Sequence, residues 1–230
     1  MYAQGSIDSA ASAPRQQQAK FWDAPYVKDA ETDLNALGLC QRFARHGEIH
    51  AQGEPADKLY KVLTGAVRTA QLLADGRRQI GGFYLPGEVF GLADGEPHGF
   101  TAEALAPTTL LVLRRDTLIS RAARDPKLSR DLWQLTTAQL ARTERHLMVL
   151  GRKTALERVA CFLLDLSARG GDNDDIVLPM CRQDIADYLG LTIETVSRMM
   201  TRLEQMGLIA LPSSRRVRLC DADALRDLEE

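Results

Sequence analysis

The stretch Met180–Met206, MCRQDIADYLGLTIETVSRMMTRLEQM, decides how the C-terminal part of this chain folds. Apolar residues recur at helical spacing on both sides of Gly190, and a glycine between two such runs is typical of a turn. They are Ile185, Ala186 and Leu189 before the glycine, and Val196, Met199, Met200 and Leu203 after it. The pattern predicts a helix-turn-helix, in which the first helix lies across a DNA backbone and the second enters the major groove.

Four side chains on the outer face of the second predicted helix are expected to contact base edges. They are Ile193, Glu194, Ser197 and Arg198. Glu194 can accept a hydrogen bond from the amino group of cytosine, and Arg198 can donate two bonds to guanine. The same two residues are also spaced as an i,i+4 pair that could merely support an exposed helix. The spacing alone leaves both interpretations open.

A second group of residues is expected to contact DNA phosphates. Arg182 and Gln183 fall in the first turn of the first helix, where backbone amides and the helix dipole attract phosphate. Further on, Ile209–Leu211 and Arg216–Leu219 flank the turn Pro212–Ser214, which predicts a two-stranded hairpin, or wing, against the phosphates. The complete set of expected phosphate contacts is Arg182, Gln183, Thr192, Thr195, Arg202, Ser213, Ser214, Arg215 and Arg216.

Cys181 occupies the predicted N-cap position of the first helix, with Asp184 three residues later. Ser or Thr is the usual residue there. A helix N-terminus next to an arginine favours the reactive thiolate of a cysteine. Oxidation to a sulfenic or sulfinic acid would add negative charge and bulk within reach of a DNA phosphate. We therefore expect Cys181 to be redox-regulatory, the alternative being a cysteine tolerated in place of threonine.

Composition limits the kind of protein this is. The 230 residues carry a formal net charge of −2, so DNA binding has to use local basic clusters and not a generally basic surface. No apolar run approaches the ~18 residues that span a bilayer, and the N-terminus lacks a signal-peptide pattern, so we expect a cytoplasmic protein without membrane contacts. The four cysteines form no C-x-x-C pair, and thiols are expected.

Residues 31–118 contain short runs of β-type residues separated by turn signals, whereas residues 1–30 are rich in Ala, Ser, Gln and Pro and are expected to form a flexible arm. The clearest predicted strands are Leu59–Leu63, Ala66–Leu73, Gln79–Tyr84 and Thr109–Leu113, and Asp75–Gly76 is a strong hairpin signal between the second and the third. Several short strands at this spacing predict a β-roll of jelly-roll type.

Residues 119–150 change to a helical pattern, with an entry point at Asp125–Pro126. Intervals of three and four residues along it are typical of a coiled-coil interface. The residues at these intervals are Trp133, Thr136, Leu140, Thr143, Leu147 and Leu150. A second apolar face, with Leu132, Leu135 and Val149, allows packing on the roll instead of, or together with, a twin helix. The two threonines predict an adjustable dimer.

The last segment, residues 151–230, is predicted to be a separate DNA-binding domain. Gly151–Lys153 is expected to break the long helix and to serve as a hinge. Thr154 and Glu157 have the spacing of a capping box that starts the next helix. The expected fold class is therefore α+β, with an N-terminal β-roll, a long dimerisation helix and a C-terminal winged helix-turn-helix.

The residues Met180–Ala186, Leu189–Thr192 and Glu194–Arg198 resemble the signature of the CRP/FNR family of bacterial transcription regulators, and the Glu-x-x-Ser-Arg form resembles the FixK and FNR branches. A weaker resemblance extends from about residue 34. It implies a homodimeric regulator, more specifically an activator, that contacts RNA polymerase and binds a palindrome of the TTGAT-N4-ATCAA type, with Glu194 and Arg198 addressing the G·C pair.

Two departures from the family bear on effectors. Where cyclic-nucleotide-binding members carry a Gly-Glu pair and an Arg-Ser/Thr-Ala run, this chain has Gly91-Leu92 and Phe100-Thr101-Ala102, so the charged groups for ribose and phosphate are missing. An iron-sulfur cluster needs about four thiolates, and the N-terminal arm has no cysteine. We therefore expect no cofactor.

Two alternatives remain. The first is a regulator gated by an unidentified small molecule in the roll. The second is a cupin-like metal enzyme with His46 and His50 as ligands, but this spacing in a strand separates the two residues by roughly 13 Å, and no His-x-His or paired carboxylate completes a set. No arrangement of residues resembles a nucleophile with its base, so we expect neither catalytic nor metal-binding residues.

Overall fold

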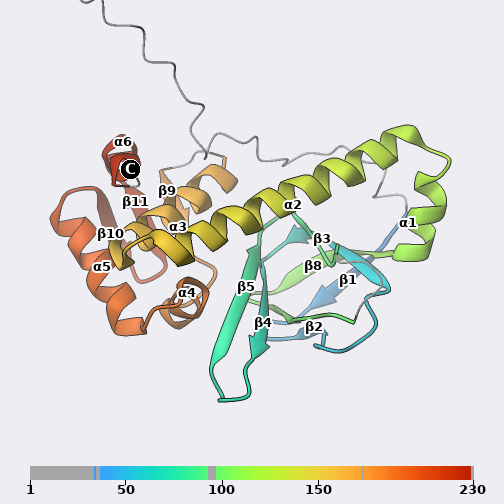
Figure 1. Cartoon of the computed structure of the whole chain (residues 1–230), viewed down its shortest axis with the longest axis horizontal. Helices are drawn as coiled ribbons and strands as arrows, with labels where there is room; N and C mark the ends of the chain where they lie inside the picture. The colour runs from blue at the N-terminus through green and yellow to red at the C-terminus, as the bar shows by residue number, and fades with distance from the viewer. Residues whose placement is uncertain (1–33, 35–36, 93–96, 172–173, 229–230) are drawn as a thin grey trace, which may run out of the picture.

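The computed structural model describes residues 34, 37–92, 97–171 and 174–228. Figure 1 shows a β-roll and a C-terminal helical domain, with one long helix running from the far end of the roll to that domain. The predicted arm, residues 1–30, lies outside the described residues. The predicted α+β class and the order of its three parts are confirmed.

Within the described residues, eight strands form the roll as two four-stranded antiparallel sheets, ordered β1-β8-β3-β6 and β2-β7-β4-β5. The strands are β1 Leu39–Phe43, β2 Glu48–His50, β3 Lys58–Thr64, β4 Val67–Leu72, β5 Arg78–Tyr84, β6 Val89–Phe90, β7 Thr101–Ala104 and β8 Thr108–Arg114. They include all four strands predicted from the sequence. Gly76 has a φ of 82° in the β4–β5 turn, a backbone conformation that favours glycine.

Two helices follow the roll, α1 Arg115–Ala122 and α2 Pro126–Arg152, so the predicted helical segment 119–150 spans the end of one helix and most of the next. The Asp125 carboxylate caps α2 by accepting from the backbone N–H groups of Lys127 and Leu128 at 3.0 and 3.2 Å. The predicted break over Gly151–Lys153 is found at its last residue, because α2 continues through Gly151 and ends at Arg152, and Lys153 is extended. A glycine inside a helix costs only about 1 kcal/mol, too little to end a helix of this length.

The two faces of α2 have different surroundings. Leu128 is buried against the roll, and Leu132 and Leu135 pack on the same apolar cluster. On the other face, the side chains of Trp133, Leu140 and Leu147 are 70%, 58% and 69% exposed. The helix therefore uses one apolar face within the chain and leaves the other uncovered.

The C-terminal domain contains α3 Ala155–Arg169, β9 Asp175–Val177, α4 Arg182–Leu189, α5 Ile193–Gln205, β10 Ile209–Ser213, β11 Arg216–Leu219 and α6 Ala222–Asp227. The predicted capping box at the start of α3 is confirmed, with Thr154 and Glu157 bonding each other's backbone N–H groups. The three strands form a sheet in the order β10-β11-β9.

The turn of the wing differs from the prediction. β10 runs on through Pro212 to Ser213, which pairs with Arg216, and the register is irregular between Ala210 and Ser213. Proline is tolerated there because an edge strand with an irregularity does not need its missing N–H. The turn therefore lies at Ser214 and Arg215.

One apolar core joins the roll to the C-terminal domain. Ile80 and Phe83 of β5 belong to the same buried cluster as Phe162 of α3 and Tyr188 of α4. The rings of Phe83 and Tyr188 have centroids 5.2 Å apart. The roll consequently packs directly on the helix-turn-helix and does not reach it only through α2.

Candidate nucleic-acid interface

The helix-turn-helix consists of α4 and α5, as predicted. Gly190 ends α4 with a φ of 62°, and the backbone N–H of Leu191 still donates to the Ala186 carbonyl at 3.0 Å. Thr192 then caps α5, because its hydroxyl accepts from the Thr195 backbone N–H at 3.2 Å. The inner face of α5 is fully packed, since Val196, Met200 and Leu203 are at most 1% exposed.

All four expected base-contacting residues lie on the exposed outer face of α5. They are Ile193, Glu194, Ser197 and Arg198. Arg198 Nη2 donates to the Thr195 hydroxyl at 3.3 Å, so its guanidinium is oriented along the helix and is not committed to Glu194. A backbone hydrogen bond and a bond from Thr192 hold the pKa of Glu194 below its ordinary value. Glu194 is therefore ionised near neutral pH and able to accept.

The expected phosphate contacts at the start of α4 differ in their surroundings. Arg182 Nη1 is buried and has no hydrogen-bond partner among the described residues. Burial, and then the nearby charge of Arg215, lowers the pKa of Arg182. An anion beside the guanidinium would oppose both effects. Gln183 is exposed, but its Nε2 atom already donates to Asp187 at 2.7 Å. An oxyanion would meet an unsatisfied donor at Arg182 and would compete with Asp187 for Gln183.

The wing presents exposed side chains at Ser213, Ser214 and Arg216. Arg215 is different, because its Nη1 atom donates to the Pro179 carbonyl at 2.9 Å and thereby fixes the wing to the segment before α4. This structural role was not evident from the sequence, since it depends on a carbonyl 36 residues away. Among the remaining candidates, Thr192 and Arg202 are exposed and Thr195 is half-buried.

Cys181 is exposed at the N-cap of α4. Its backbone N–H donates to Asp184 Oδ2 at 3.1 Å. The Asp184 carboxylate, three residues after Cys181, therefore caps the start of α4. The other cysteines lie on separate elements, Cys40 in β1, Cys161 in α3 and Cys220 after β11, and the described residues contain no disulfide between any of the four.

The expected dimer residues follow the uncovered face of α2. Trp133, Thr136, Leu140, Thr143 and Leu147 are exposed, and Leu150 is half-buried. The hydroxyls of Thr136 and Thr143 donate to the carbonyls of Leu132 and Gln139 at 2.9 and 3.0 Å. With these bonds satisfied inside the helix, the threonines can present their methyl groups to a neighbour.

The interior of the roll contains an arrangement that sequence reasoning missed. His50 and His98 are 6% and 8% exposed, and their rings stack with centroids 3.6 Å apart. Their positions 48 residues apart gave no signal, and His98 had the sequence environment of a surface loop. His46, the other candidate ligand, is exposed. Within the described ranges, no three His, Cys, Asp or Glu side chains are grouped to hold a metal ion.

Phe100 occupies a position that carries an arginine in cyclic-nucleotide-binding relatives, as the sequence resemblance implies. A Cβ added to Gly81 would come within 2.8 Å of the Phe100 ring, so the ring lies directly against the β5 backbone. An aromatic ring in this place provides no charge for a phosphate.

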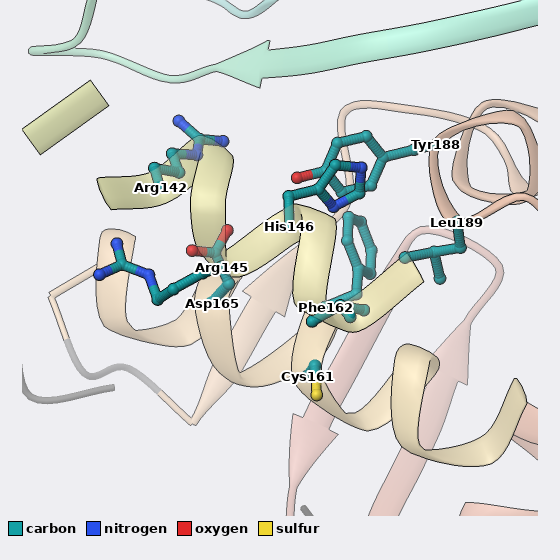
Figure 2. Close-up of a pocket in the computed structure, with 9 residues that line it drawn as sticks. Arg142, Arg145, His146, Cys161, Phe162, Asp165, Tyr188 and Leu189 are labelled. Carbon is teal, nitrogen blue, oxygen red and sulfur yellow. The ribbon is translucent and has the colours of Figure 1, made fainter. Parts of the chain in front are cut away.

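A small cavity lies between α2, α3 and α4 (Figure 2). His146 of α2 and Tyr188 of α4 line it and stack on each other, with ring centroids 4.0 Å apart, and Cys161 and Asp165 contribute from α3. Its volume of about 30 Å³ has room for roughly one water molecule. The cavity is thus a packing feature of the junction between the helices and is too small for an organic effector.

Of the described helices, none combines the length and apolar character of a transmembrane span.

Comparisons with known proteins match both halves of this architecture. The model of the cyclic nucleotide-binding domain matches residues 40–125, and that of the Crp-like helix-turn-helix domain matches residues 157–228. The nitrogen fixation regulation protein FixK of Azorhizobium caulinodans is 51% identical over 199 residues, which cover 84% of this chain and 80% of that protein. FixK of Rhizobium meliloti is 50% identical over 181 residues, covering 79% and 82% of the two chains.

The solved structure of FixK2 from Bradyrhizobium japonicum has the same fold, with a TM-score of 0.80 and 43% identity over 84% of this chain and 98% of that chain. The identity and the coverage extend over the roll, the long helix and the winged helix-turn-helix together, and the curated relatives are named regulators. The chain therefore belongs to the CRP/FNR family as a FixK-like transcription regulator, and it is not an enzyme.

Proposed function

We propose that two copies of this chain bind a palindrome of the TTGAT-N4-ATCAA type and activate transcription through contacts with RNA polymerase. The observation that carries the proposal is the outer face of α5, where Glu194, Ser197 and Arg198 are exposed while the inner face is packed into the domain. An ionised Glu194 would accept from cytosine, and Arg198 would donate to guanine of the same base pair.

The dimer would form along α2. Trp133, Leu140 and Leu147 expose large apolar side chains at heptad-like intervals, and a second copy of α2 would cover them. Two-fold symmetry then places one α5 at each half-site, which is why the proposed operator is a palindrome.

We further propose that DNA binding needs neither cyclic AMP nor an iron-sulfur cluster. Phe100 against Gly81 supports the first part, because the ring has no charge for a cyclic phosphate. The placement of the four cysteines on separate elements supports the second, because a cluster needs about four converging thiolates.

Oxidation of Cys181 is proposed to weaken DNA binding. The thiol is exposed and lies at the N-terminus of α4, next to the expected phosphate contact Arg182. Hydrogen peroxide would oxidise the thiol to a sulfenic acid with release of water, and a second peroxide would give the sulfinic acid. The added negative charge would repel the phosphate that Arg182 attracts.

A gel-shift experiment tests the proposal. Purified protein without added effector is titrated onto the palindrome and onto a duplex in which both half-sites are scrambled, and mass spectrometry of the same preparation checks for a co-purified small molecule. We expect retardation of the palindrome alone by protein that carries no ligand. Binding only after addition of an effector, or equal binding of both duplexes, would contradict the proposal.

A further inference from the structure

The roll holds the helix-turn-helix by ion pairs that are shielded from solvent. Arg68 Nη1 of β4 and Arg78 Nη2 of β5 both donate to Asp184 Oδ1 of α4 at 2.6 Å. Arg78 Nε also donates to Asp187 Oδ2 at 2.7 Å. The side chain of Asp184 is only 3% exposed, and that of Arg68 is 13% exposed. We call these four residues the ionic junction.

Asp184 links this junction to the end of α4 that faces DNA in the proposed complex. Its second oxygen, Oδ2, accepts from the Cys181 backbone N–H at 3.1 Å. Burial alone would raise the pKa of Asp184, but the bonds from Cys181 and the charges of Arg68 and Arg78 outweigh it and hold the pKa below its ordinary value. One ionised carboxylate therefore both caps α4 and binds two arginines of the roll.

Contacts beside the ionic junction prevent α4 from rotating about it. Tyr188 of α4 packs against Phe83 of β5 on one side and stacks on His146 of α2 on the other. α3 is bound to the roll as well, since Arg169 Nε donates to Glu88 Oε1 at 2.8 Å in a buried pair. A rotation of α4 and α5 relative to the roll would leave several buried charges without partners, which is costly.

We propose that Arg68 and Arg78 are positioning residues for DNA recognition: through Asp184 and Asp187 they fix α4 and α5 on the roll and thereby set the spacing between the half-sites that a dimer accepts. The inference rests on the proposed function, because it assumes a dimer on a palindrome. Neither arginine needs to touch DNA. The ionic junction supplies, without a ligand, the fixed orientation that an effector would otherwise have to induce.

The test compares spacing profiles of the full chain and a variant with both Arg68→Gln and Arg78→Gln. Affinities are measured for palindromes whose central spacer is varied from two to six base pairs and for a single half-site. We expect the parent to lose about 10-fold or more in affinity when the spacer changes by one base pair, and the variant to lose less than about 3-fold. Half-site affinity should be the same for both proteins.

Arg77→Gln is the matched control. Arg77 is the neighbour of Arg78 and, within the described part of the chain, its ion pair is with Asp75 of the same turn, 2.7 Å away, where both side chains are at least half exposed. This variant should keep the parental profile. Arg78→Lys keeps the charge but lacks the forked donor set, so its profile should lie between those of the parent and the double variant. Arg78→Gln alone, at a side chain that is 28% exposed, replaces the double variant if that variant does not fold.

Limited trypsin digestion gives a readout that does not depend on DNA. Arg152 is the last residue of α2, and Lys153 lies between α2 and α3. If the C-terminal domain is released, trypsin should cleave there faster in the double variant than in the parent or in Arg77→Gln. A parental spacing profile together with parental cleavage would overturn the inference. If the parent bound no palindrome at all, the proposed function would fail, and the digestion would still decide whether the ionic junction holds the domain.

Discussion

Arg198 is positioned by its own helix before any DNA is present. Thr192 caps α5, the hydroxyls of Thr192 and Thr195 lie 3.1 Å apart, and Arg198 donates to Thr195. The cap that starts the helix thus also restricts the side chain proposed to contact guanine. Such preorganisation lowers the conformational entropy lost on binding.

Replacement of Arg198 should relax sequence specificity. We expect Arg198→Ala to cost ~1–3 kcal/mol on the operator and to reduce discrimination at one base pair, because a bidentate contact is lost. Competition gel shifts with operators substituted at each position measure this. Arg182→Ala is the control, and it should weaken binding to every duplex by a similar factor. An unchanged ratio between operator and scrambled duplex in Arg198→Ala would refute the base-contacting role.

Cys181 is the residue at which peroxide should act. In Cys181→Ser the hydroxyl can still cap α4 but cannot form a sulfenic acid, so DNA binding should become insensitive to peroxide while the reduced proteins bind alike. Cys220→Ser, which removes another exposed thiol, should remain as sensitive as the parent. Equal peroxide sensitivity of Cys181→Ser and the parent, measured by gel shift, would exclude the mechanism.

Sequence reasoning succeeded for residues whose role is decided within a few positions of the chain. The pair Thr154 and Glu157 forms the expected capping box because both partners belong to one helical turn. It missed roles that depend on distant partners. Arg215 is bound by the Pro179 carbonyl, and His98 stacks on His50, and neither contact has a local sequence signal.

At the scale of elements, α2 shows how one helix serves two partners. The 3.6-residue period places Leu128, Leu132 and Leu135 against the roll. The opposite face, which carries Trp133 and Leu140, stays uncovered. The two faces could be separated from the sequence by their spacing. The end of the helix was predicted to within three residues, Gly151–Lys153, and the helix continues through Gly151 because open space surrounds this residue and nothing forces the chain to turn there.

A charge on the uncovered face of α2 should break the dimer without unfolding the chain. We expect Leu140→Glu combined with Leu147→Glu to raise the dimer dissociation constant by about 100-fold or more, since like charges would face each other across the interface. Sedimentation equilibrium measures this, with circular dichroism as the check on folding.

Leu39→Glu is the matched control for that variant. Leu39 is 80% exposed on β1, at the edge of the roll, so the substitution adds the same charge to an exposed apolar site outside the proposed interface. It should leave the association state unchanged. A dimer that persists in the α2 variant would show that another surface holds the two copies together.

At the scale of the whole molecule, the roll and the C-terminal domain share one buried core, in which Ile80 and Phe83 meet Phe162 and Tyr188. The sequence predicts two units joined by a hinge, because periodicity marks elements but not the contacts between units. The shared core and the ionic junction imply that both units unfold together, in a single cooperative transition.

Acid should destabilise this single transition through two histidines with strongly lowered pKa values, His50 of the roll and His146 of α2, which stacks on Tyr188 of the C-terminal domain. Burial, as the larger cause, and the nearby charge of His98 lower the pKa of His50 from 6.5 to about 4. Burial, as the larger cause, and the positive charge of Arg142 lower the pKa of His146 from 6.5 to about 4. As the pH falls below 6.5 the unfolded chain therefore binds protons that the folded chain does not, and stability decreases until the pH reaches about 4.

After allowance for partial solvent exposure, we expect each histidine to lower the free energy of unfolding by about 1 kcal/mol between pH 7.5 and pH 5. Urea unfolding at several pH values measures this. His50→Phe and His146→Phe keep the ring contacts, and each should remove its own contribution to the dependence of stability on pH. Because the core is continuous, each variant should shift the whole transition. If His146→Phe split the unfolding transition into two, the roll and the C-terminal domain would unfold independently. The ionic junction could then not fix the orientation of one relative to the other.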